Sequence, residues 1–103
     1  MTTQPPIACS LSASEMPARR AEIAVLARAL VSAEAQGARA VLRFRAGART
    51  RERVAAFVEA EGRCCPFLRL ELRDGEGVLT LTIEGPAGSE PVVDELVGSF
   101  GPR

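Results

Sequence analysis

Residues 67–84 read FLRLELRDGEGVLTLTIE and contain the clearest structural pattern of the chain. Leucines alternate with mostly charged residues from Phe67 to Arg73, and leucine or isoleucine alternates with threonine from Val78 to Glu84. A period of two is typical of a strand that buries one face, and residues 74–77 (DGEG) are turn formers. We therefore expect an antiparallel hairpin here.

The rest of the chain predicts one further strand and three helices around this hairpin. Residues Arg39–Arg45 alternate in the same way and predict a strand. Helical spacing of apolar residues predicts helices over about Ser14–Gln36 and about Thr50–Glu61, and a last helix capped by Ser89. A short strand at Ile7–Leu11 is a further candidate. The expected fold is α+β, a small, mostly antiparallel sheet of three to four strands with helices packed on one face, in the order (β)-α-β-α-β-β-α.

Length and charge narrow the class of protein. The 103 residues fit one domain, which we place at residues 7–100 behind a flexible lead-in at residues 1–6. Thirteen basic and thirteen acidic residues cancel, and Trp and Tyr are absent, which together argue against nucleic acid as a partner. No secretory signal and no apolar run of roughly 20 residues is present, so we expect no membrane partner. These features predict a cytoplasmic protein with reduced thiols.

The chain contains no His, which removes the commonest general base and metal ligand. Its chemistry therefore centres on three cysteines, Cys9 and the adjacent pair Cys64 and Cys65. An odd number of cysteines with two adjacent is unlike the disulfide framework of a secreted mini-protein. A disulfide between neighbours would require a strained ring, so we rank it below separate thiols.

Glu61 is the acidic candidate beside the pair. It continues the apolar stripe of the second predicted helix, seven residues after Val54 and four after Phe57. A carboxylate at that phase faces the interior, where it needs a partner, a proton or a metal. The alternative is that the helix frays at Gly62 and Glu61 turns into solvent.

Three thiolates without His suit a soft ion. Cu(I), Hg(II), As(III), or Zn(II) completed by Glu61 or water, are the candidate ligands of Cys9, Cys64 and Cys65. The negative end of a helix dipole at the pair favours a bound cation over a nucleophilic thiolate. The opposing interpretation is that the cysteines are buried and pack as small apolar residues.

The chain also resembles a family of small, mostly uncharacterised bacterial domains. The pattern is a Cys before a long helix and then E-x-x-C-C-P-F before a strand, matched here by Cys9, Glu61, Cys64, Cys65, Pro66 and Phe67. The similarity runs from about Ile7 to Phe100, and such domains are loosely associated with heavy-metal resistance. The resemblance implies that Cys9 belongs with the pair. The residue before the first Cys of the pair is often acidic in that family, whereas here it is Arg63.

Three functional hypotheses follow, and only the second would make the chain an enzyme. The first is a buffer, chaperone or sensor module that binds a soft metal or metalloid ion through Cys9, Cys64, Cys65 and Glu61. The second is a thiol redox or transfer protein that uses the Cys64–Cys65 pair and needs one exposed sulfur. The third is an interaction domain with core cysteines. A homodimer formed at the exposed edge of the hairpin is compatible with each.

Overall fold

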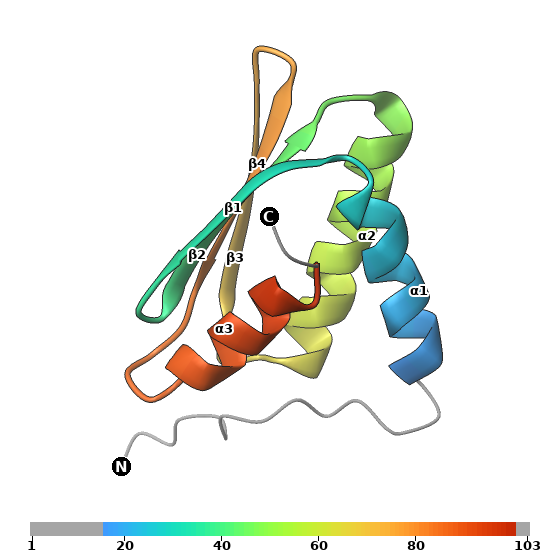
Figure 1. Cartoon of the computed structure of the whole chain (residues 1–103). Helices are drawn as coiled ribbons and strands as arrows, with labels where there is room; N and C mark the ends of the chain where they lie inside the picture. Colours follow the sequence, from blue (N-terminus) through green and yellow to red (C-terminus); the bar gives the residue numbers. More distant parts are fainter. Residues whose placement is uncertain (1–15, 101–103) are drawn as a thin grey trace.

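The computed structural model describes residues 16–100 and contains three helices and four strands in that range (Figure 1). Their order is α-β-β-α-β-β-α. The elements are α1 Met16–Ala27, β1 Leu30–Gln36, β2 Arg39–Arg45, α2 Ala48–Cys64, β3 Arg69–Gly75, β4 Val78–Glu84 and α3 Glu90–Gly98. The candidate strand at Ile7–Leu11 lies outside the described residues.

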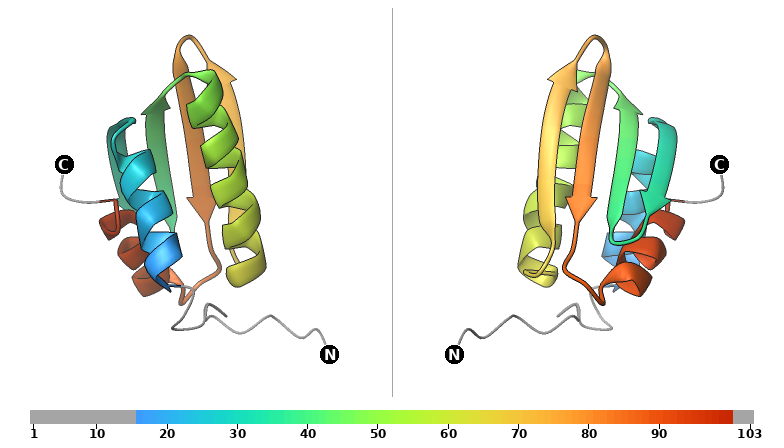
Figure 2. Two further views of the ribbon diagram at one scale, coloured as in Figure 1. Left: turned by 90° about the vertical axis from the view of Figure 1, so that its right-hand side faces the viewer. Right: turned by 90° about the vertical axis from the view of Figure 1, so that its left-hand side faces the viewer.

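The four strands form one antiparallel sheet in the order β1-β2-β4-β3. β3 and β4 pair as the predicted hairpin, with Leu72 opposite Leu81. β2 lies beside β4, with Leu42 opposite Leu81. All three helices lie on one face of the sheet and the other face is uncovered (Figure 2). The predicted α+β architecture is therefore confirmed.

The first predicted helix was too long, because residues Leu30–Gln36 form strand β1 instead of its second half. Ala, Glu and Gln in this stretch favour a helix intrinsically, but pairing along β2 overrides that preference. Gly37 has φ +62° and forms the tight turn between β1 and β2. The register shifts between Leu30 and Ser32, which leaves Val31 52% exposed.

The second helix differs from the prediction at both ends. It begins at Ala48, two residues before the expected start at Thr50, and it ends at Cys64 instead of Glu61. Gly62 therefore does not stop the helix, although a helical glycine costs roughly 1 kcal/mol relative to alanine. As a result, the first cysteine of the pair lies within α2.

The core fills the space between the sheet and the helices. α2 packs on β3, α3 packs on β1 and β2, and α1 packs mainly on α2. Phe100, after α3, is buried with its ring edge-on to Phe44 of β2 and Phe57 of α2. The fully buried positions include Leu42, Phe44, Val54, Leu79, Leu81, Ile83 and Val93. No helix of the described part of the chain is long and apolar enough to cross a membrane.

Candidate thiol site

The C-terminal end of α2 brings a carboxylate and two cysteines together. The buried residues of this helix are Val54, Phe57, Glu61 and Cys64, which are spaced by three, four and three positions. That spacing places them on one stripe of the helix. Glu61 is only 5% exposed, so the alternative in which it turns into solvent is wrong.

The chain leaves the helix at Cys65. Its φ of −125° and ψ of 74° lie outside the helical region, because Pro66 disfavours a helical conformation in the residue before it. The Cys65 amide still donates a hydrogen bond of 2.7 Å to the Glu61 carbonyl. The helix therefore ends in a way that keeps Cys65 turned back toward Glu61.

Two distances define the site. The sulfurs of Cys64 and Cys65 lie 3.9 Å apart. The Cys65 sulfur lies 3.5 Å from Oε1 of Glu61. The surroundings exclude water, because Cys64 is 6% exposed and Cys65 is fully buried.

Arg19 of α1 completes this cluster, and the sequence analysis did not identify it. One of its terminal nitrogens donates a hydrogen bond of 2.8 Å to Oε2 of Glu61, and the two side chains are 12% and 7% exposed. Its guanidinium also lies over the Phe57 ring, 5.8 Å from the ring centre. The only sequence signal was indirect, because a buried Glu61 requires a cation from another element.

The charge state of Glu61 reflects opposing influences. Burial raises the pKa of the Glu61 carboxyl above its ordinary value, Arg19 lowers it, and the negative charge of Glu22 raises it. The effect of burial is the largest, so the net direction is upward. Glu61 therefore holds a proton to higher pH than an exposed glutamate does.

The oxidation state of Cys65 differs from the expectation of reduced thiols, because Cys65 is disulfide-bonded. The bond does not run to Cys64, since a separation of 3.9 Å far exceeds the roughly 2.05 Å of a disulfide. The strained ring between neighbours is therefore not formed, as predicted. Cys9, the expected third member, lies outside the described residues.

No group of three or more His, Cys, Asp or Glu side chains within residues 16–100 could by itself hold a metal ion. The sulfurs of Cys64 and Cys65 do lie side by side, and Glu61 contacts Cys65. Further ligands for an ion would have to come from outside this part of the chain. The described pair supplies at most the core of a metal site.

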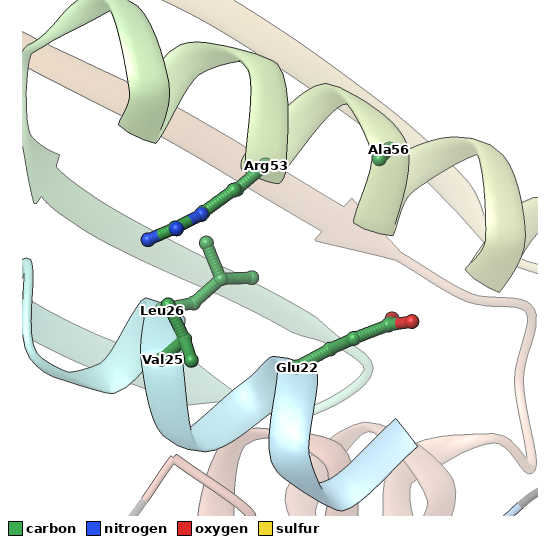
Figure 3. A pocket seen from close by; sticks show the side chains of 5 residues that line it. All are labelled: Glu22, Val25, Leu26, Arg53 and Ala56. Atoms are coloured by element: carbon green, nitrogen blue, oxygen red, sulfur yellow. The ribbon is translucent and has the colours of Figure 1, made fainter. Parts of the chain in front are cut away.

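A groove separate from the cysteines runs along the seam of α1 and α2 (Figure 3). Its volume is about 250 Å³. Its lining residues are Glu22, Val25 and Leu26 of α1 with Arg53 and Ala56 of α2. The groove therefore offers no access to the sulfurs.

Comparisons of the chain with protein-family models, with curated proteins and with solved structures found no match. The chemistry of the site therefore carries the functional argument.

Proposed function

We propose that the reduced protein binds one soft metal or metalloid ion at the end of α2. Cys64 and Cys65 are the primary ligands, Cys9 is the third, and Glu61 is a fourth or outer ligand. The candidate ions are Hg(II), Cu(I), As(III) and Zn(II). The protein would act as a small buffer, chaperone or sensor module in the reducing cytoplasm, where the disulfide of Cys65 is opened.

The sulfur-to-sulfur distance is the observation that carries this proposal. Two thiolates that bind one tetrahedral zinc at about 2.3 Å lie about 3.8 Å apart. The two sulfurs here are separated by 3.9 Å. The pair therefore needs little rearrangement to share an ion.

Burial also favours a ligand role over a nucleophilic one. A reactive cysteine is usually exposed and surrounded by positive charge. Here both cysteines are buried, and Oε1 of Glu61 lies 3.5 Å from the Cys65 sulfur. These surroundings suit a bound cation better than an attacking thiolate.

Thiol–disulfide exchange is the second candidate, and the disulfide of Cys65 is the observation that favours it. A small external thiol would attack this disulfide, form a mixed disulfide with one sulfur and release the other as a thiolate. A second external thiol would then resolve the mixed disulfide, leaving two protein thiols and one external disulfide. The burial of Cys65 predicts that this exchange is slow.

Competitive titration of the fully reduced protein with each of the four ions tests the first proposal. We expect a one-to-one complex that protects at least two thiols from alkylation, as counted by mass spectrometry. Replacing both Cys64 and Cys65 by Ser should abolish that binding, while circular dichroism should verify that the fold persists. If the folded double variant kept its affinity for the ion, the proposal would be refuted.

Glu59→Gln is the matched control for Glu61→Gln in the same titration. Glu59 lies on the same helix but is exposed and pairs with Arg63. We expect weaker binding in Glu61→Gln and unchanged binding in Glu59→Gln. Equal affinities in the two variants would remove Glu61 from the ligand set.

A further inference from the structure

The seam between α1 and α2 has an unusual distribution of charge. The two helices run antiparallel, and Leu26, Val25 and Ala56 form the apolar part of the groove between them (Figure 3). Glu22 and Arg53 are exposed, and their charged ends point in opposite directions along the seam. An apolar strip thus carries a negative group toward one end and a positive group toward the other.

We propose that this seam is the interface of a homodimer, in which Glu22 of each copy pairs with Arg53 of the other. A two-fold axis that lies in the plane of the interface and crosses the middle of the groove places Glu22 of one copy opposite Arg53 of its partner. The surface is therefore self-complementary, which is the condition for an isologous interface. The inference does not depend on ion binding at the thiol site, although the charge of Glu22 also acts on Glu61.

The side chains between these charges favour a close approach of helices. Ala24 on α1 and Ala56 on α2 are exposed, and Val25 is half-buried. Small residues let helix backbones approach closely. The α1–α2 pair of one copy would pack against the same pair of the other copy, which gives a group of four helices. The two sheets then lie on the outside of the dimer.

The size of the helices sets the expected strength of association. α1 has 12 residues and α2 has 17, which correspond to lengths of about 18 and 26 Å. Two adjacent helices of this length, each about 10 Å across, present a face of roughly 400 Å² per copy. Such a face is smaller than that of a stable interface and matches a weak, transient association. We therefore expect a reversible dimer with a Kd of order 100 micromolar.

Charge reversal across the seam tests the pairing. The full chain is kept reduced, so that intermolecular disulfides do not contribute, and its mass is followed by sedimentation over a concentration series that spans this Kd. We expect Glu22→Arg and Arg53→Glu each to weaken the dimer about tenfold by placing like charges opposite each other. The variant that carries both reversals should recover the affinity of the natural chain.

Arg73→Glu is the control, because Arg73 is exposed on β3, away from the seam of α1 and α2. Its dimer affinity should equal that of the natural chain. A natural chain that stays monomeric across the series overturns the proposal. The proposal is also overturned if Glu22→Arg and Arg53→Glu leave the dimer affinity unchanged, or if the variant with both changes does not recover it.

Discussion

Glu61 occupies a position of α2 that an apolar residue would ordinarily fill. Its carboxylate joins two groups, since Oε2 accepts from Arg19 and Oε1 lies 3.5 Å from the Cys65 sulfur. Burial of a charge is costly unless the charge is paired. Arg19 therefore explains how a carboxylate can remain beside the two cysteines.

Replacing Arg19 by Gln should destabilise the protein. Removing one partner of a buried pair leaves the other without its cation, although Glu61 can reduce the cost by taking up a proton. We expect a loss of about 2–3 kcal/mol in the free energy of unfolding, measured by urea denaturation. Arg20→Gln changes the exposed neighbour and should stay within about 0.5 kcal/mol of the natural chain. Equal stabilities of the two variants would contradict a structural role for the Arg19–Glu61 pair.

The raised pKa of Glu61 predicts how stability depends on pH. In the unfolded chain this carboxyl titrates near its ordinary value of 4.5, and in the folded protein it titrates higher. Between these two values the folded state binds more protons, so the free energy of unfolding falls as pH rises. Glu61→Gln should remove this part of the pH dependence, whereas Glu59→Gln should retain it. If the free energy of unfolding changed with pH in the same way in the natural chain and in Glu61→Gln, Glu61 would not be the group responsible.

At the scale of single elements, the sequence predicted strands more reliably than helix ends. The alternation in residues 78–84 matches β4 residue for residue, because one face of that strand is buried. Residues Leu30–Gln36 were assigned to a helix because their composition favours one, and only pairing with β2 makes them a strand.

The candidate site was also predictable only where it depends on the pattern within one element. The phase of Glu61 on α2 was visible in the spacing of apolar residues, and so was its proximity to the cysteine pair. The contribution of Arg19 was not visible, because it depends on how α1 packs on α2. Contacts between elements that are distant in sequence leave no local pattern.

Gly62→Ala is the sharpest test of α2 as a helix that continues to Cys64. A Cβ at Gly62 meets no atom within 4 Å, so alanine fits without repacking. We expect a gain of about 0.5–1 kcal/mol in the free energy of unfolding. Gly37→Ala is the contrasting variant, since φ +62° strains an alanine and should cost about 1 kcal/mol. A destabilised Gly62→Ala variant would indicate that the helix ends before the cysteines.

At the scale of the whole molecule, the thiol site and the proposed dimer seam lie in different places. The thiol site lies at the C-terminal end of α2, whereas the proposed dimer seam runs along the sides of α1 and α2 (Figure 1). The groove residues do not include either cysteine. Charge reversal at Arg53 should therefore change the dimer affinity and leave the number of bound ions per chain unchanged, as measured by native mass spectrometry.

X-ray absorption at the metal edge tests whether the Cys64–Cys65 pair binds the ion. The reduced full-length protein is loaded with one equivalent of Zn(II), and the neighbours of the ion are identified by element and distance. We predict at least two sulfur neighbours at about 2.3 Å, which disappear when Cys64 and Cys65 are both replaced by Ser. A spectrum with only oxygen or nitrogen neighbours, or one that is unchanged in the double variant, would contradict ion binding by the Cys64–Cys65 pair.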